Sequence, residues 1–328
     1  MRFQVTFDHG VVWDFEAEGE AESFLESVAL MMGLSQAEGG ADRCIHFEVM
    51  SREPGTFFGP RLLQYLRRLP AEEWKIREFH NMVFFQHPAV REVICETDSE
   101  EELPLRVYQM RRSLLPVYID AMLTGGLPVH GALVEIEGSG VILAGSSGAG
   151  KSTTSRRFPP PWSVLGDDLC LVVRGASGEY RVHPLPTWSA FGGNGGSGVC
   201  HSGLSVPLRA VFFLAQSQED CCLDLKRSIT ALSLSRSALE VFRSIDFEFP
   251  RREEASVKKA LYESAASIAM ATPAYHLCLS LTGRFWEKIE EVLERVKQSR
   301  GEVNLNTGVG IDAMGLAQGQ CFSCEDVK

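Results

Sequence analysis

Residues 145–152 read GSSGAGKS and match the pattern G-x-x-x-x-G-K-[ST] at every fixed position. In such a loop the glycines allow successive backbone N–H groups to turn toward phosphate oxygens. Lys151 then reaches the β- and γ-phosphates of a nucleotide, and the Ser152 hydroxyl ligates Mg²⁺. The helix expected to begin near Lys151 points the positive end of its dipole at the same anion. The stretch therefore predicts a site for ATP and Mg²⁺.

The surroundings of this loop favour the nucleotide site over a chance glycine turn. Four fixed positions match by accident in roughly one chain of this length in a hundred at average residue frequencies. The apolar run Val141–Ala144 precedes the loop, which gives the strand-loop-helix order that the site requires. The predicted nucleotide-binding residues are Gly145, Ser146, Ser147, Gly148, Ala149, Gly150, Lys151, Ser152 and Thr153.

Two adjacent carboxylates, Asp167 and Asp168, follow the loop between the apolar stretches WSVL and LCLVV. Beside a phosphate site such a pair can divide two tasks. One carboxylate ligates Mg²⁺, and the other accepts a proton from an attacking hydroxyl. The alternative is a polar Asp-Asp turn that caps a strand, but the nearby phosphate loop favours the catalytic interpretation.

His130 is the third candidate for chemistry. It begins an expected strand that pairs, through the turn at 138–140, with the strand leading into the phosphate loop. An imidazole at that position could contact a transferring phosphoryl group. The spacing alone fits equally well a histidine that is satisfied within the sheet.

The elements that position these residues alternate between strands and helices. Phe3-Val5-Phe7 and Val11-Trp13-Phe15 predict a hairpin around Asp8-His9-Gly10. A short helix after the loop must end by Phe158, because three prolines follow. Further strands are expected over 132–137, 141–144, 169–173, 180–183, 210–215 and 275–281, and helices over 21–34, 57–69, 105–124, 228–245, 252–271 and 285–298.

The acidic stretch 94–104 (ICETDSEEELP) predicts a hinge between two domains. We expect an N-terminal β-rich α+β accessory domain over 1–100 and an α/β domain over 101–300. The tail over 301–328 is rich in Gly and Asn and lacks periodicity, so it is expected to be disordered. Its lone Cys321-x-x-Cys324 has no second pair of ligands, which disfavours a structural zinc site.

Composition excludes several classes of protein. Lys and Arg total 32 and Asp and Glu total 43, giving a net charge of −11. Such a chain is a poor binder of nucleic acid or anionic membranes unless one face is basic. No apolar run reaches the roughly 18 residues of a membrane helix, and the first residues lack the apolar core of a secretory signal. The nine scattered cysteines then predict reduced thiols in the cytoplasm.

The stretch 130–173 resembles the catalytic core of the HPr kinase/phosphorylase superfamily, which shows a His-Gly strand, a G-x-G turn, a phosphate loop and an Asp-Asp pair in this order. The resemblance implies an HPr-kinase/PEP-carboxykinase-like P-loop kinase core. The chain is more similar to the relatives found with peptide-modification genes, of the SynChlorMet cassette protein ScmC type, than to kinases of HPr itself. No loop that would grip the carrier protein HPr is identified.

Position by position, the resemblance implies roles for the candidate residues. His130 matches the active-site histidine, Lys151 the phosphate-loop lysine, and Asp167 the aspartate that polarises the acceptor serine. Ser152 matches the metal-binding serine and Asp168 the second acid, and these two residues are the predicted ligands of Mg²⁺. The family's downstream metal-binding glutamate has no identified counterpart, and GGNGGSG at 192–198 occupies its approximate region.

These observations predict an ATP- and Mg²⁺-dependent kinase that phosphorylates a serine or threonine of a peptide or small protein. The resemblance implies radical-SAM peptide-modifying enzymes as further partners, and leaves a homo-oligomer open. Two alternatives remain: an ATPase or nucleotide switch, and a degenerate kinase that serves as a peptide-binding module.

Overall fold

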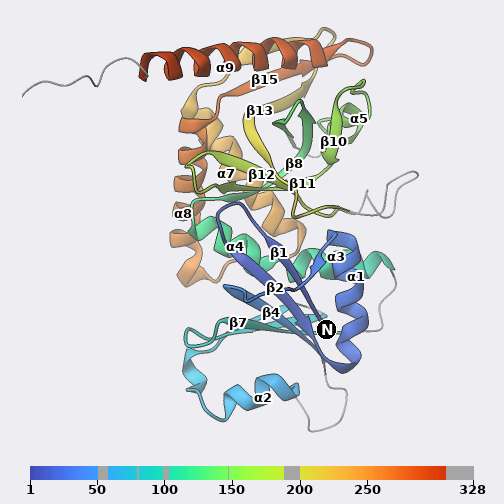
Figure 1. The fold of residues 1–328 in the computed structure, drawn as a ribbon, viewed down its shortest axis with the longest axis vertical. Helices are drawn as coiled ribbons and strands as arrows, with labels where there is room; N and C mark the ends of the chain where they lie inside the picture. Colours follow the sequence, from blue (N-terminus) through green and yellow to red (C-terminus); the bar gives the residue numbers. More distant parts are fainter. Residues whose placement is uncertain (51–57, 80, 99–102, 147, 188–199, 308–328) are drawn as a thin grey trace, which may run out of the picture.

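The computed structural model describes residues 1–50, 58–79, 81–98, 103–146, 148–187 and 200–307. Its described part is a mixed α/β structure with two mixed β-sheets (Figure 1). The first sheet is formed by residues up to 97 and the second by residues from 127 onward. The boundary between domains at residue 100 stays a prediction.

The first sheet has the strand order β3-β1-β2-β4-β7-β6-β5. Its strands are β1 (Arg2–Thr6), β2 (Val12–Ala17), β3 (Ser35–Gln36), β4 (Arg43–Val49), β5 (Lys75–Phe79), β6 (Met82–Gln86) and β7 (Glu92–Thr97). The hairpin expected from the first fifteen residues is confirmed, because β1 and β2 pair antiparallel across the predicted turn. The strands β2, β4 and β7 are instead parallel neighbours.

The hinge predicted over 94–104 is wrong in its first part. Residues 94–97 belong to β7, which lies inside the first sheet and is buried along its whole length. The acidic residues of this strand lie on one face and its apolar residues Val93 and Cys95 on the other, where they join the main core. The acidic composition of this stretch therefore indicated a solvated linker, whereas residues 94–97 belong to a strand with one acidic and one apolar face. Residues 99–102 lie outside the described part.

The second sheet has the order β10-β8-β11-β12-β13-β15-β14, and β9 pairs with both β8 and β13. Its strands are β8 (Leu127–Ile136), β9 (Ser139–Ala144), β10 (Ser163–Gly166), β11 (Leu169–Arg174), β12 (Tyr180–Pro184), β13 (Val206–Gln216), β14 (Cys221–Asp224) and β15 (Ala274–Leu279). Every residue of β9 is buried. The strand that leads into the phosphate loop is thus an interior strand with partners on both sides.

The helices cover the faces of these sheets (Figure 1). They are α1 (Glu22–Met32), α2 (Pro60–Leu66), α3 (Leu103–Ser113), α4 (Leu115–Leu123), α5 (Lys151–Ser155), α7 (Arg227–Ser244), α8 (Arg251–Ala271) and α9 (Phe285–Thr307), with the short 3-10 turns η1 (Gly19–Ala21) and η2 (Ala71–Glu73). The largest core combines apolar residues of β1, β2 and α1 with apolar residues of α4, β8, β11, α7 and α8. A second core lies between the other face of the second sheet and α9.

Two helix predictions need correction. The single helix expected over 105–124 is divided at Leu114, because Pro116 lacks a backbone N–H and crowds the preceding turn. The disorder expected from Gly301 onward is wrong for residues 301–307, because α9 continues to Thr307. One glycine inside a helix costs only about 1 kcal/mol, so it does not by itself end the helix. Residues 308–328, with the CxxC, lie outside the described part.

Gly140 in β9 makes a close contact that a side chain would break. A Cβ at this position would lie 2.5 Å from Val206 Cγ2 and 3.1 Å from the carbonyl oxygen of Pro207. We expect Gly140→Ala to lower the free energy of unfolding by about 1–3 kcal/mol, because overpacking forces the neighbouring strand to move. Denaturant unfolding measures this, with Gly203→Ala as control, since its nearest atom would be 4.0 Å away. Equal stability of the two variants would contradict the close packing.

His183 links the N-terminal hairpin to the second sheet. It lies at the end of β12 and is fully buried, with Nε2 3.1 Å from Asp8 Oδ2 and Nδ1 3.0 Å from the Ser202 carbonyl oxygen. Arg181 contacts the same Asp8 carboxylate at 3.1 Å. The histidine thus helps to fix the N-terminal hairpin to the second sheet.

This contact predicts a pH dependence of stability. Burial lowers the pKa of His183, although Asp8 opposes the shift. The unfolded histidine, with a pKa of about 6.5, binds a proton more readily than the folded one. Its contribution to stability is therefore complete above about pH 6.5 and is lost as the pH falls from there through the lower folded-state pKa. In urea unfolding at pH 7.5 and 5.5, His183→Gln should reduce the difference in the free energy of unfolding between the two pH values. The control His276→Gln should leave it unchanged, and an unchanged slope in His183→Gln would refute the assignment.

Within the described residues, no helix combines the length and apolar character needed to cross a lipid bilayer.

Candidate active site

The phosphate loop lies between β9 and α5, and its glycines have the geometry that the sequence predicts. Gly148 and Gly150 have φ angles of 81° and 98°, a region that side chains rarely adopt. A Cβ on Gly145 would lie 2.9 Å from the Cβ of Ala149. All three glycines are therefore needed for this backbone path, while Ser147 lies outside the described residues.

The loop is also held from the neighbouring strand. Gln216, the last residue of β13, donates a hydrogen bond from Nε2 to the carbonyl oxygen of Gly148 at 3.0 Å. The amide of Ala149 donates to the Ser146 carbonyl oxygen at 3.0 Å. Ser152 and Thr153 at the start of α5 are exposed, so their hydroxyls are accessible to a ligand.

Lys151 is buried at the centre of the loop. Its Nζ donates to the carbonyl oxygens of Gly145 at 2.8 Å and Ser146 at 3.4 Å. Burial lowers its pKa, and the carboxylates of Asp168 and Glu240 oppose this. No carboxylate in the described part of the chain lies within 4.0 Å of Nζ. The ammonium is bonded to neutral oxygens and can exchange them for those of a phosphate.

The structure brings His130 and Asp168 together beside this lysine. In the pairing of β8 with β11, His130 is opposite Leu169, and the Gly131 amide donates to the Asp168 carbonyl oxygen at 2.9 Å. The Nδ1 of His130 lies 3.4 Å from Oδ1 of Asp168. Burial lowers the pKa of His130, and Asp168 partly restores it.

Asp167 has a different partner from its neighbour. Its Oδ1 accepts a hydrogen bond from Thr187 Oγ1 at 2.6 Å, and Thr187 is buried. The two carboxylates are therefore held separately, Asp168 against the histidine and Asp167 against the segment after β12. This is the separation that two distinct tasks would require, but the assignment of each task stays a prediction.

Helix α7 supplies residues that the sequence analysis missed. Ser237 Oγ accepts from the His130 amide at 3.0 Å and donates to its carbonyl oxygen at 3.1 Å. Glu240 follows one helical turn later on the same side of α7. Burial lowers the pKa values of both His130 and Lys151, and the Glu240 carboxylate opposes each shift. The Ser-x-x-Glu spacing was visible, but nothing in the sequence connects it to a loop some ninety residues earlier.

The chain is similar in sequence to several curated proteins that share one name. The HPr kinase/phosphorylase of Bacillus pumilus is 25% identical over 158 residues, which cover 45% of this chain and 51% of that protein. The Bacillus subtilis protein of the same name is 27% identical over 154 residues, or 43% and 49% of the two chains. That of Listeria innocua is 26% identical over 147 residues, or 41% and 46%. The chain spans about half the length of these curated relatives.

A family model covers a longer stretch. The model described as SynChlorMet cassette protein ScmC matches residues 93–294, which is more than half of the chain. The matched stretch contains the phosphate loop, His130, both aspartates and Glu240. The resemblance predicted from residues 130–173 is thereby confirmed, and the chain belongs to the family of the SynChlorMet cassette protein ScmC.

Proposed function

We propose that the chain is an ATP- and Mg²⁺-dependent kinase that transfers the γ-phosphoryl group to a serine or threonine hydroxyl of a peptide or small protein. The observation that carries this proposal is the convergence of Lys151, His130 and Asp168 at a glycine loop of nucleotide-binding sequence. The distant similarity to proteins named HPr kinase/phosphorylase indicates a kinase-like family and supports the reaction class.

The residues present fit a nucleotide triphosphate. The two positive-φ glycines allow the loop backbone to turn its N–H groups toward one point. Lys151 provides a cation with no carboxylate bound to it in the described structure. Burial of such a group makes its attraction for phosphate stronger than it would be in water.

The same residues provide oxygen ligands of the kind that Mg²⁺ prefers. The Ser152 hydroxyl and the Asp168 carboxylate would hold the ion. Glu240, whose carboxylate raises the pKa of Lys151 against the effect of burial, is a candidate to take the part of the family glutamate. When bound, Mg²⁺ neutralises charge on the phosphate oxygens.

The protein's own groups then account for the proton and the leaving group. Asp167 accepts the proton of the acceptor hydroxyl, whose oxygen forms a bond to the γ-phosphorus. The bond from that phosphorus to the β–γ bridging oxygen breaks, and ADP leaves. Lys151 stabilises the phosphate charge, while His130 keeps Asp168 oriented through the 3.4 Å contact.

Two features of the setting belong to the same proposal. All seven cysteines in the described part are free thiols, which suits the reducing cytoplasm. The acceptor peptide would be shared with radical-SAM peptide-modifying enzymes, whose copurification with the chain is a direct check.

The test is incubation with γ-labelled ATP, Mg²⁺ and the peptides encoded beside the gene, followed by mass spectrometry. One added phosphate on a peptide serine or threonine supports the proposal. Slow release of free phosphate that a partner accelerates, without acceptor labelling, would instead indicate a nucleotide switch. Tight ATP binding without any transfer would indicate a peptide-binding module.

A further inference from the structure

One face of the first sheet carries an unusual set of buried polar residues. The parallel register pairs Glu16 on β2 with His46 on β4, and Cys44 on β4 with Glu92 on β7. Because side chains alternate along a strand, alternate residues of these three neighbours share one face. The residues on it are Asp14, Glu16, Cys44, His46, Glu48, Glu92, Ile94 and Glu96.

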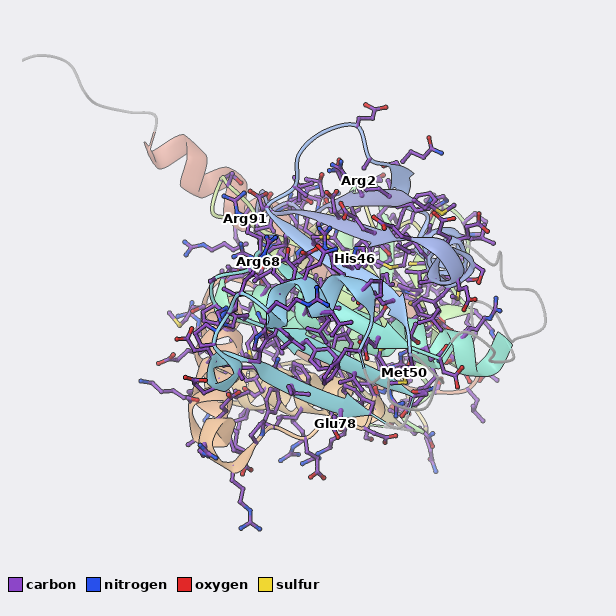
Figure 2. The ribbon with its side chains drawn as sticks, turned by 90° about the horizontal axis from the view of Figure 1, so that it is seen from below. Arg2, His46, Met50, Arg68, Glu78 and Arg91 are labelled. Carbon is purple, nitrogen blue, oxygen red and sulfur yellow. The ribbon has the colours of Figure 1, made fainter. Side chains whose placement is uncertain are left out.

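Helix α2 covers this face on the side away from the second sheet (Figure 1). Leu62 of α2 packs with Ile94 and Phe85 in a small separate core. Figure 2 views the molecule from this side and shows His46 near the middle of the view, below Arg2. A cavity of about 230 Å³ adjoins the face and is lined in part by His46, Glu48 and Arg61.

Within the described part of the chain, the five carboxylates of this face have few cationic partners. Arg2 lies 2.9 Å from Asp14 and 3.6 Å from Glu16, and Arg61 lies 3.0 Å from Glu92. The other two carboxylates, Glu48 and Glu96, accept backbone amides at the start of α2. Among the described residues, two guanidinium groups thus serve five carboxylates, four of which are buried. Buried charge of this kind is costly unless it is paired or bound to a metal.

Three of these residues converge. One oxygen each from Glu16 and Glu92 and one ring nitrogen of His46 all lie within 4.8 Å of one another. His46 is 3% exposed, and its buried Nδ1 has no hydrogen-bond partner among the described residues. The nearest carboxylate oxygen is Glu16 Oε2, at 3.9 Å, which is too far for a hydrogen bond. A buried imidazole thus lies beside two carboxylates, in a group whose ligand atoms are close enough together to hold a metal ion.

The existing contacts of Glu92 leave it able to bind further. Its carboxylate accepts Arg61 at 3.0 and 3.2 Å and the Tyr65 hydroxyl. An ionised carboxylate has about four lone-pair directions, so these bonds do not exhaust it. Arg61 and Tyr65 would orient the carboxylate as outer hydrogen-bond partners do in metal sites.

We propose that Glu16, His46 and Glu92 form a binding site for a divalent transition-metal ion of the Zn²⁺ type. An imidazole nitrogen and two carboxylate oxygens suit such an ion, with water from the adjoining cavity as a further ligand. Bonds of about 2.1 Å place two ligand atoms on a tetrahedral ion roughly 3.4 Å apart. Binding therefore draws the three side chains closer together than they are now, and it is independent of the proposed phosphoryl transfer.

The test uses the full chain with Cys321→Ser and Cys324→Ser, which removes the tail thiols as competing ligands, and no nucleotide. Titration with Zn²⁺ against a chromophoric chelator should show one tight equivalent. Co²⁺ in place of Zn²⁺ should give weak d–d absorption without a sulfur charge-transfer band, since no thiolate is a ligand. His46→Gln and Glu16→Gln should each weaken binding at least about 10-fold.

Matched controls separate this site from adventitious binding. His276→Gln and Glu38→Gln remove the same groups from other parts of the chain and should retain the tight equivalent. Circular dichroism without metal checks that each variant folds, and Glu16→Gln remains informative if His46→Gln does not. Absence of a stoichiometric equivalent, unchanged affinity in a folded His46→Gln or Glu16→Gln, or a sulfur charge-transfer band would overturn the proposal.

Discussion

Asp167→Asn is expected to lower phosphoryl transfer by about 10²- to 10⁴-fold, the usual contribution of a positioned general base, while the Kd for ATP changes less than about 3-fold. The amide cannot take the proton of the acceptor hydroxyl. It has nearly the same shape, and its Oδ1 can still accept the hydrogen bond from Thr187 that now measures 2.6 Å. The local structure should therefore survive the substitution. Single-turnover transfer and equilibrium ATP binding, measured on the same sample, separate the two effects.

Asp168→Asn is the variant to compare with Asp167→Asn, because Asp168 contacts His130 and its charge raises the pKa of Lys151. Its loss should weaken Mg²⁺-dependent ATP binding as well as transfer. The exposed Asp224→Asn provides a control for loss of one carboxylate far along the chain and should change neither. If Asp167→Asn lost ATP binding and transfer to the same extent, Asp167 would be a binding residue and its role as base would be wrong.

Much of the second sheet could be predicted from the sequence, because its turns and helix ends depend on a few residues that are adjacent in the chain. The turn at 138–140 brings β8 and β9 together, and the prolines at 159–161 stop the helix after the loop; both are confirmed. The signal that divides α3 from α4 was also local, since Pro116 was present in the sequence. The strong apolar periodicity around Pro116 nevertheless favoured one continuous helix.

The parts of the site that sequence reasoning missed depend on distant contacts. Ser237 bonds to the backbone of His130, and Glu240 influences the pKa of that histidine, only because α7 packs against β8. The acidic residues of β7 are buried because α2 covers them. Arg61 in that helix pairs with Glu92, and the Gly59 amide just before the helix donates to Glu96. In both cases the chemistry of a residue is set by an element that lies far away in the sequence. The residues next to it in the sequence therefore do not indicate its role.

Lys151→Ala is expected to weaken ATP binding and transfer together, with transfer falling by about 10²- to 10³-fold, the effect of losing one preorganised charge-stabilising donor. Arginine and lysine side chains elsewhere cannot replace it, because Lys151 is buried inside the loop. The exposed Lys226→Ala serves as the matched control and should leave both quantities unchanged.

Stability distinguishes this role from a structural one. Burial lowers the pKa of Lys151, so the folded state holds its charge less favourably than the unfolded chain does. The Lys151 ammonium now donates hydrogen bonds to two carbonyl oxygens of the loop. No described carboxylate lies within ion-pair distance to offset the cost of burying the charge. Lys151→Ala should therefore change the free energy of unfolding by less than about 1 kcal/mol while ATP binding is lost. A large fall in stability would show that the lysine holds the loop together. Normal turnover in a stable Lys151→Ala protein would refute the phosphate-loop assignment itself.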